Sequence, residues 1–395
     1  MQLQYHRPGV PFEVLSNPEF LTEGTAVMDL LRPSRVLIGS GKTISGLAAA
    51  ETLASLYHWI SPEKILRTNH WSSELAKLVS NAILAQRISS INTVSAMCEA
   101  IGADITEVSQ AVGMDHRIGL SYLQSGLGFG GSCLRKDTLG LAYLAEFLDL
   151  PEVASYWKAV VDINTWQVDR FVERIIKLFH GTLRGNKLAI FGYAFKENTS
   201  DSRESQSIQV IRQLLQEQPE EIAIYDPGCD VDLMQDELLR TLSPLNSSVK
   251  MYRGPYEACE GASAVLILTP WEEFKYPPCS AKASPAAIVE NDNLLISRPD
   301  GHIKLALSGN MESQEGYLKP GPDCLAGCAK CRQELAGERS GPRWQPVNWE
   351  SVLQHMKQPR WVFDARRQVQ AEELEKLGCK VVTLGQSSFV LNDRL

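Results

Sequence analysis

The chain has 395 residues, of which 44% are hydrophobic and 22% are charged, and a formal net charge of −8. This composition is typical of a folded chain long enough for two or three domains, and the acidic balance argues against a nucleic-acid-binding protein. No apolar run reaches the roughly eighteen residues of a membrane span, no signal peptide is recognisable, and the nine cysteines are not spaced as a disulfide framework, so the reducing cytosol is the expected compartment.

Residues 1–66 are predicted to contain strands and a helix of an α/β unit. Apolar runs at 12–15 and 35–39 predict strands, and the Ala- and Leu-rich stretch 43–59 has helical periodicity. A dinucleotide-binding domain opens with a strand and a G-x-G-x-x-G turn, and nothing before Pro18 supplies that turn. We therefore expect residues 1–66 to be the remnant of such a domain without its first half.

Residues 67–180 are predicted to be mostly helical. Apolar side chains recur at intervals of three and four residues from Leu75 to Ile91, which is the spacing of a buried helix face. A second long helix is expected from Pro151 to Ile176, with the proline in its first turn.

The most informative stretch lies between these helices, at residues 128–137, where the sequence is GFGGSCLRKD. Glycines let the backbone approach a ligand closely. Cys133 follows them at the entry to a helix, where the helix N-terminus and a cation, Arg135 or Lys136, stabilise a thiolate. This pattern indicates a covalent nucleophile. A buried structural cysteine after a tight turn is the alternative.

Residues 181–395 are predicted to form a second α/β domain. Its apolar strands alternate with helical stretches, which indicates a parallel sheet. We expect these strands at 187–192, 221–226, 264–269 and 361–364. Ligands on such sheets bind at the carboxyl ends of the strands. The side chains of Phe195, Lys196, Arg366 and Arg367 fall at those ends.

Residues 277–346 interrupt this domain with a Pro-, Gly- and Ser-rich segment that we expect to be a disordered insertion. Within it, Cys324, Cys328 and Cys331 are spaced like zinc ligands, with Cys279 or His302 as a fourth partner. Because the fourth partner is distant, we predict no metal site. A solvated linker or a translated non-coding segment explains the composition as well.

Several blocks in chain order resemble the UDP-glucose branch of the nucleotide-sugar 6-dehydrogenase family. The blocks are residues 14–26, 71–81, 128–137, 191–196 and 201–205. The resemblance extends from about Phe12 to Tyr276 and from about Val347 to Gly385. It implies a partial NAD-binding domain, a central helical region and a C-terminal Rossmann-like UDP-binding domain. It also implies a cytoplasmic homo-oligomer, built from dimers and a hexamer in the family, with the long helix at the dimer interface.

The reaction that the resemblance implies is the NAD-dependent oxidation of UDP-glucose to UDP-glucuronate. Two hydrides leave carbon 6 in succession, and a cysteine captures the intermediate aldehyde as a thiohemiacetal that becomes a thioester. Cys133 matches the family's nucleophile, and Lys77 matches a lysine that stabilises an oxyanion. Glu19 matches the general acid/base, which works if its environment raises its pKa. Asn81, four residues after Lys77, can hydrogen-bond substrate or water. Asp137, four residues after Cys133, can orient Lys77 or a water.

The resemblance also assigns ligand contacts. For UDP-glucose it nominates Phe20, Leu21, Arg117, Tyr122, Phe129, Gly130, Phe195, Lys196 and one or both of Arg366 and Arg367. For NAD it nominates Glu23, Cys133, Leu134, Arg135, Lys136 and Arg203. Arg117 corresponds to a residue that reaches a neighbouring subunit's site. Gln124 stands where the family usually has a lysine, which should weaken contacts to substrate.

Other interpretations remain open. One is a catalytically impaired subunit that binds UDP-sugar and pairs with full-length copies. Another is a sibling dehydrogenase acting on UDP-N-acetylmannosamine or GDP-mannose. An incomplete gene model would explain both the missing first half and the insertion. Because the implied UDP-sugar contacts are present and the first dinucleotide-binding turn is not, we expect the chain as given to bind UDP-sugar far better than NAD.

Overall fold

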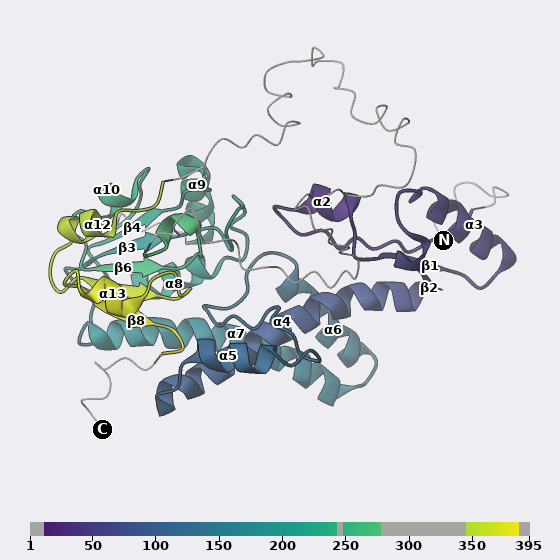
Figure 1. Ribbon diagram of the computed structural model, residues 1–395, viewed down its shortest axis with the longest axis horizontal. Helices are drawn as coiled ribbons and strands as arrows, with labels where there is room; N and C mark the ends of the chain where they lie inside the picture. Colours follow the sequence, from purple (N-terminus) through teal and green to yellow (C-terminus); the bar gives the residue numbers. More distant parts are fainter. Residues whose placement is uncertain (1–11, 243–247, 278–344, 387–395) are drawn as a thin grey trace, which may run out of the picture. The chain divides into compact units, whose positions relative to one another are not determined.

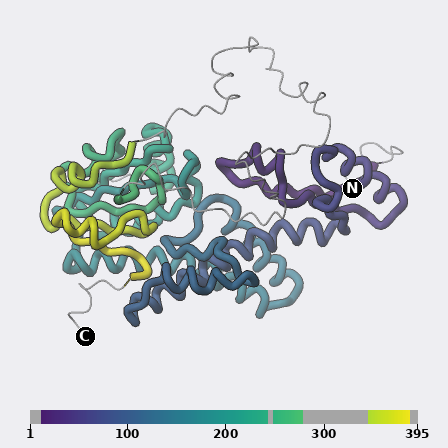
Figure 2. The backbone as a smooth tube through the Cα atoms, viewed as in Figure 1, coloured from purple at the N-terminus to yellow at the C-terminus, as the bar shows by residue number. Residues whose placement is uncertain are grey.

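The structure is a computed structural model that describes residues 12–242, 248–277 and 345–386, and Figures 1 and 2 trace them. Most of the segment predicted to be disordered and the three cysteines with zinc-like spacing, Cys324, Cys328 and Cys331, fall within residues 278–344, which lie outside the described residues.

A small parallel sheet forms the amino-terminal part of the described chain. Strand β1 (Val36–Ser40) pairs in parallel with β2 (Ile65–Asn69), and α3 (Ile44–Ser55) and η1 (Pro62–Lys64) connect them. A short helix, α2 (Ala26–Leu31), precedes the sheet. The predicted strand at 35–39 and helix at 43–59 are confirmed within a few residues.

The predicted strand at 12–15 is wrong. Those residues have no regular structure, and only Ser16 forms an isolated antiparallel bridge, with Gly39. Phe12 and Val14 are exposed, whereas Val36 and Ile38 of β1 are buried against Ala50 of α3. A short apolar run that finds no surface to cover gains nothing from pairing as a strand.

The central part is helical, as predicted. Its helices are α4 (His70–Ile101), α5 (Ile105–Gly113), α6 (Leu134–Phe147) and α7 (Pro151–Leu178). The side chain of Asn69 caps the start of α4 by accepting a hydrogen bond from the N–H of Ser72 at 2.8 Å. Gly102, with φ of 81°, ends the same helix in the left-handed conformation. Pro151 opens α7, where a missing N–H costs nothing.

The carboxy-terminal part contains a six-stranded parallel sheet in the order β5-β4-β3-β6-β7-β8. Its strands are β3 (Lys187–Phe191), β4 (Glu221–Tyr225), β5 (Val249–Met251), β6 (Ala264–Ile267), β7 (Trp361–Asp364) and β8 (Lys380–Thr383). Helices and turns connect them: α8 (Gln206–Gln216), α9 (Val231–Thr241), α10 (Pro255–Cys259), η2 (Glu272–Phe274), α12 (Trp349–His355) and α13 (Ala371–Glu375). The order reverses between β3 and β6, so this is a doubly wound, Rossmann-like sheet whose ligand crevice is expected at the carboxyl ends of those two strands.

Alternating side chains of the strands bury both faces of this sheet. Leu188 and Ile190 of β3 point into a core shared with α7 and α8, where Phe171 meets Phe363 of β7 at 6.4 Å between ring centroids. Phe191 points to the opposite face and lies 6.0 Å from the ring of Trp349 of α12. Figure 1 shows α10 and α12 on one face and α7 and α8 on the other. The near-continuous apolar strands of the sequence are therefore explained by burial on both faces.

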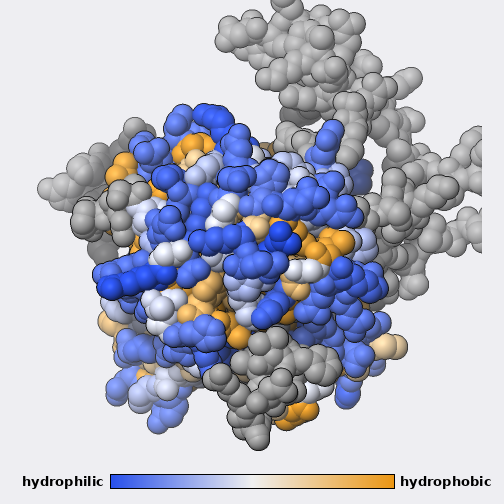
Figure 3. All heavy atoms as spheres, turned by 90° about the vertical axis from the view of Figure 1, so that its left-hand side faces the viewer, coloured by the Kyte–Doolittle hydropathy of each residue, from blue (hydrophilic) through white to orange (hydrophobic). Residues whose placement is uncertain are grey.

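Figure 3 shows one face of the molecule, which is mostly hydrophilic with scattered hydrophobic side chains. Among the described residues, no helix is both long enough and apolar enough to cross a membrane.

Candidate active site

The glycine-rich loop before α6 places Cys133 at the amino end of that helix. Gly128 and Gly131 have φ of 108° and 79°, which other residues rarely adopt. Cys133 is the N-cap residue of α6; its side chain is exposed and makes no capping hydrogen bond. The hydroxyl of Ser132 lies 3.8 Å from Sγ. An exposed thiol at a helix N-terminus is suited to act as a nucleophile, and the alternative of a buried structural cysteine is wrong for this position.

Lys77 on α4 contacts Glu19, which lies in the segment before α2. The Lys77 ammonium donates to the backbone carbonyl of Glu19 at 2.5 Å and lies 3.1 Å from its carboxylate. The Glu19 carboxylate also accepts the N–H of Leu21 at 2.6 Å. Burial raises the pKa of Glu19, but the N–H of Leu21 and the ammonium of Lys77 outweigh it, so that the pKa lies below its ordinary value. The raised pKa on which the predicted general acid/base role depends is therefore absent in this arrangement.

Asn81 and Asp137 meet one turn further along the helices that carry Lys77 and Cys133. The Asn81 amide donates to the buried Asp137 carboxylate at 2.6 Å, and Lys136 lies 3.5 Å from the other carboxylate oxygen. Asp137 therefore orients Asn81. The suggested contact between Asp137 and Lys77 does not occur, because Lys77 is held by Glu19.

Phe20 brings aromatic surface to the same place. The guanidinium of Arg35 lies 4.0 Å from the centre of its ring, and the ammonium of Lys77 lies 5.3 Å from it. Such cation–π contacts fix the ring beside the two cations. Leu21, which follows, is exposed.

The turn after β3 bears Phe195 and Lys196, and it contacts the same amino-terminal segment. The Lys196 ammonium donates to the backbone carbonyl of Glu23 at 2.6 Å, and Thr199 donates to the Glu23 carboxylate at 2.6 Å. A Cβ added to Gly131 would lie 2.9 Å from the ring of Phe195. This turn therefore touches both Glu23 and the loop that leads to Cys133.

Arg366 and Arg367, adjacent in sequence after β7, have different partners. Arg366 is partly buried; its guanidinium donates to the carbonyl of Leu268 at 2.6 Å and to that of Gly128 at 3.2 Å. Burial lowers its pKa to about 10. Arg367 instead pairs with Asp104 at 3.1 Å. Of the two arginines, Arg366 is the one that reaches the glycine-rich loop.

Arg203 lies beside the nucleophile loop, because its carbonyl accepts the N–H of Gly131 at 3.1 Å. Its guanidinium binds the Asp201 carboxylate through Nε and Nη2, the latter at 2.7 Å. This hydrogen bond raises the pKa of Arg203 above its ordinary value. The side chains of Arg135 and Lys136 are exposed on the first turn of α6. Cations and a helix N-terminus thus surround Cys133.

The structure does not bring every predicted residue to this place. Arg117 is 78% exposed and pairs with its neighbour Asp115. Tyr122, with φ of 61°, and Gln124 are also exposed. Within the described ranges, none of the three forms a hydrogen bond or ion pair with another of the predicted site residues.

Two buried amides in contact with the loop, Asn164 of α7 and Gln206 of α8, were missed by the sequence reasoning. A signal existed for the first. Asn164 occupies a position of the buried face of α7, between Val161 and Val168, where a polar side chain must have a partner.

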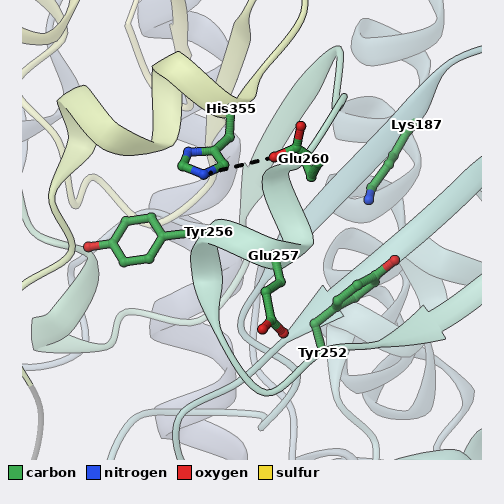
Figure 4. A pocket seen from close by; sticks show the side chains of 6 residues that line it. All are labelled: Lys187, Tyr252, Tyr256, Glu257, Glu260 and His355. Carbon is green, nitrogen blue, oxygen red and sulfur yellow. Dashed lines mark ion pairs between the residues drawn. The ribbon is translucent and has the colours of Figure 1, made fainter.

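A cavity of about 410 Å³ lies elsewhere, at the amino end of β3 (Figure 4). It is lined by Lys187, Tyr252, Tyr256, Glu257, Glu260 and His355. His355 lies 3.8 Å from Glu260, with its ring near that of Tyr256. None of these residues belongs to the predicted site. In the part of the chain that the structure describes, no group of three or more His, Cys, Asp or Glu side chains could hold a metal ion.

Three sequence models of one enzyme family match the chain. The central domain of the UDP-glucose/GDP-mannose dehydrogenase family matches residues 71–166, its UDP binding domain matches residues 189–295, and its NAD binding domain matches residues 2–61.

Curated relatives and a solved structure agree with these matches. A UDP-glucose 6-dehydrogenase of Caenorhabditis elegans is 49% identical over 276 residues, covering 69% of this chain and 57% of the relative. The Bos taurus enzyme of that name is 50% identical, covering 68% of this chain and 55% of the relative. The chain thus spans about half the length of these relatives.

Among solved structures, a UDP-glucose dehydrogenase from Pyrobaculum islandicum is 36% identical, with a TM-score of 0.59, and covers 67% of this chain and 57% of that one. A UDP-D-ManNAc dehydrogenase from Pyrococcus horikoshii has a TM-score of 0.63 over 97% of this chain and 67% of its own, but only 18% identity, so it supports the fold alone.

Proposed function

Because the chain belongs to the UDP-glucose/GDP-mannose dehydrogenase family, we propose that it takes part in the NAD-dependent oxidation of UDP-glucose to UDP-glucuronate, with Cys133 as the nucleophile. The observation that carries the proposal is that an exposed thiol begins α6, and that the Asn81–Asp137 hydrogen bond joins α6 to α4, on which Lys77 pairs with Glu19. Lys77 and Asn81 lie one turn apart on α4, so the two pairs lie on the same face of that helix.

In the proposed reaction Cys133 makes the second oxidation possible. Loss of a hydride and a proton from the carbon 6 alcohol gives an aldehyde, which has no second hydride to lose as easily. Attack by the thiolate forms a C–S bond and turns the carbonyl into an oxyanion, which takes up a proton to give a thiohemiacetal. Loss of a second hydride and that proton gives a thioester. Water then adds to the thioester, the C–S bond breaks, and the carboxylate leaves with the thiol restored.

Lys77 would stabilise the oxyanion that forms on carbon 6 at each addition, since a positioned cation stabilises charge that develops in the transition state. Glu19 would take the proton of the attacking water. Its lowered pKa keeps the carboxylate ionised at neutral pH, so that it can accept a proton, but makes it a weaker base than a carboxylate whose pKa is raised. Asn81, oriented by Asp137, would hold the substrate hydroxyl or the water.

The UDP-sugar would be bound at the carboxyl ends of β3 and β6, the switch point of the sheet. Phe195, Lys196 and Arg366 lie there, and the guanidinium of Arg366 offers a planar fork for diphosphate. Phe20, Leu21, Phe129 and Gly130 would contact the sugar. Arg117, Tyr122 and Arg367 would contribute only after rearrangement or from a neighbouring subunit.

NAD, the proposed cofactor, would accept one hydride per molecule, so the two oxidations would use two NAD molecules in succession. The donor set around Cys133 fits such a group: the exposed cations Arg135 and Lys136 stand on the free N-terminal turn of a 14-residue helix, beside Arg203. Free backbone N–H groups and cations are the donors that a dinucleotide's polar groups require. Leu134 and Glu23 would complete the contacts.

We place the proposed activity in a cytosolic homo-oligomer. The nucleophilic thiol must stay reduced, and the five described cysteines are free. Tyr143 and Phe147 of α6 and Tyr156 of α7 are exposed aromatic side chains, which supports a contact between copies along these helices.

Calorimetric titration of the purified chain with UDP-glucose and, separately, with NAD tests the binding steps, and NADH absorbance with both ligands tests turnover. Cys133→Ser should leave UDP-glucose affinity within about threefold of native and lower steady-state turnover by at least about a thousandfold. Cys379→Ser is the matched control, because this buried thiol donates to the carbonyl of Leu374 and a hydroxyl can do the same. Undiminished turnover by Cys133→Ser would refute the nucleophile.

Binding of UDP-glucose without NADH formation would support the second candidate, a UDP-sugar-binding subunit that requires another copy for catalysis. Mixing with a full-length relative should then restore turnover. Binding of neither ligand would refute both candidates. Turnover of UDP-N-acetylmannosamine or GDP-mannose in preference to UDP-glucose would indicate a sibling activity.

A further inference from the structure

The position of Cys133 has to be fixed by the backbone that precedes it. The thiol is exposed, it makes no capping hydrogen bond, and the hydroxyl of Ser132 at 3.8 Å is its recorded polar neighbour. Side-chain packing therefore does little to hold it. The glycines at 128, 130 and 131 are intrinsically the most flexible residues, so this loop needs external restraints if the thiol is to stay aligned with a substrate.

Such restraints converge on the backbone N–H and C=O of one residue, Phe129. The buried side chain of Asn164, on α7, accepts the N–H of Phe129 at 2.8 Å and donates to the carbonyl of Phe129 at 3.0 Å. Gln206, the first residue of α8, donates a second hydrogen bond to the same carbonyl. Asn164 is 5% exposed and Gln206 is 2% exposed. Phe129 is four residues before Cys133 and is itself buried against Ala85 and Val160.

The glycines on either side of Phe129 are required by these amides. A Cβ on Gly128 would lie 2.3 Å from Oδ1 of Asn164, and one on Gly130 would lie 2.6 Å from Oε1 of Gln206. Real Cβ atoms do not approach so closely, so the amides occupy the space that side chains at these positions would fill. The amides can therefore reach the loop only because residues 128 and 130 are glycines.

We propose that Asn164 and Gln206 are positioning residues of the reaction, which hold the backbone of Phe129 and thereby keep the Cys133 thiol aligned with carbon 6 of the substrate. The proposal rests on the proposed function. The amides do not touch the reacting atoms. They act through the four-residue connection to Cys133. Because Asn164 is on α7 and Gln206 is on α8, the alignment of the Cys133 thiol depends on both helices.

Buried amides are unfavourable unless they are hydrogen-bonded, so a purely structural role would predict only a loss of stability when they are replaced. A positioning role predicts local loosening of residues 126–134 and a loss of turnover with little change in substrate affinity. These consequences separate the two roles.

The test uses hydrogen–deuterium exchange of peptides that cover residues 126–134 in the whole chain. Gln206→Met keeps the volume and removes one donor, so exchange there should be about fivefold faster than in the native chain. Asn164→Ala removes both of its bonds, and exchange should be about twentyfold faster or more. Gln213→Met is the matched control, since this α8 glutamine donates to Asp169 of α7 at 2.7 Å and does not contact the loop.

The control should destabilise the α7–α8 contact and leave exchange at 126–134 within twofold of native, about the precision of the comparison. In a chain that turns over, Gln206→Met should lower kcat about tenfold or more with KM for UDP-glucose within about threefold. If the chain does not turn over, the proposed function has failed, while the exchange measurement still decides whether the amides hold the loop.

Equal exchange at 126–134 in Gln206→Met and Gln213→Met would overturn the proposal. So would a Gln206→Met chain whose kcat is native. If Asn164→Ala does not fold, Gln206→Met decides alone, because Asn164 still binds the N–H and C=O of Phe129 in that variant.

Discussion

Replacement of Gly131 by alanine should disturb the site by two separable physical effects. Gly131 has φ of 79°, where a residue with a Cβ costs about 1–2 kcal/mol. The added Cβ would also lie 2.9 Å from Cε2 and 3.1 Å from Cζ of the Phe195 ring. Ordinary contact begins several tenths of an ångström further out, so the ring or the loop must move. This movement costs about 1–3 kcal/mol more. We expect Gly131→Ala to lower the free energy of unfolding by about 2–5 kcal/mol.

Gly185 provides a matched control. Its φ of 69° is similar, but a Cβ there would meet nothing within 4 Å. Gly185→Ala should therefore cost only the backbone term, about 1–2 kcal/mol. The difference between the two variants, measured by urea unfolding of the purified chain, isolates the contact with Phe195.

Two further measurements complete the comparison. Phe195→Leu should recover part of the stability lost in Gly131→Ala, because the smaller side chain gives way. UDP-glucose affinity, by calorimetry, should fall in Gly131→Ala and not in Gly185→Ala. Equal loss of stability in the two glycine variants, or no recovery with Phe195→Leu, would show that the ring does not press on the loop.

Two other predictions concern charged groups. Burial favours the neutral form of Glu221, but hydrogen bonds from Lys250 and Lys187 lower its pKa to about 2, from 4.5. The ionised Glu221 therefore stabilises the fold above about pH 4.5, and this stabilisation is lost as the pH falls towards 2. Between about pH 5 and pH 3, the free energy of unfolding of the native chain should fall by more than that of Glu221→Gln. Parallel pH profiles of the two chains would contradict this. Glu99, 13% exposed, binds Arg174 at 3.2 Å and accepts the N–H of Gly385 at 2.7 Å. Glu99→Gln should cost about 3–5 kcal/mol in urea unfolding because it removes the carboxylate from a largely buried ion pair, and a cost below about 1 kcal/mol would be inconsistent with such a pair.

The sequence predicted elements whose signal is local. The strands at 187–192, 221–226, 264–269 and 361–364 are nearly continuous apolar runs, and each is a strand of the structure. Three strands were not predicted: β2, β5 and β8. β2 has the sequence ILRTN and is mostly exposed, and β5 has only three residues, so their pairing is imposed by the neighbouring strand. The domain divisions at 66/67 and 180/181 stay predictions.

Within the candidate site, the sequence could assign residue types to a chemistry but could not assign partners. Arg366 and Arg367 are adjacent and identical in type, and the resemblance left open which of them serves. Backbone geometry separates them: Arg367 has φ of 56° and turns to Asp104, while Arg366 turns back over Leu268 to Gly128. A left-handed conformation at a non-glycine residue is set by the tertiary structure and leaves no mark in the sequence.

The same limit explains why the restraints on the nucleophile were missed. The bond from Lys196 to Glu23 joins residues 173 positions apart, and that from Gln206 to Phe129 joins residues 77 apart. Contacts between residues so far apart produce no periodic pattern in the sequence from which they could be predicted. What the sequence does carry is a conflict: Asn164 is polar at an apolar position of α7, and Gly128, Gly130 and Gly131 form a flexible loop where a nucleophile should be rigid. A buried amide without a hydrogen bond is unfavourable, and so is a flexible loop before a nucleophile. In the structure the amide of Asn164 hydrogen-bonds the backbone of the loop, which satisfies the amide and restrains the loop. A buried polar side chain on one element and a run of glycines on another are therefore best considered as a pair when a site of this kind is sought in a sequence.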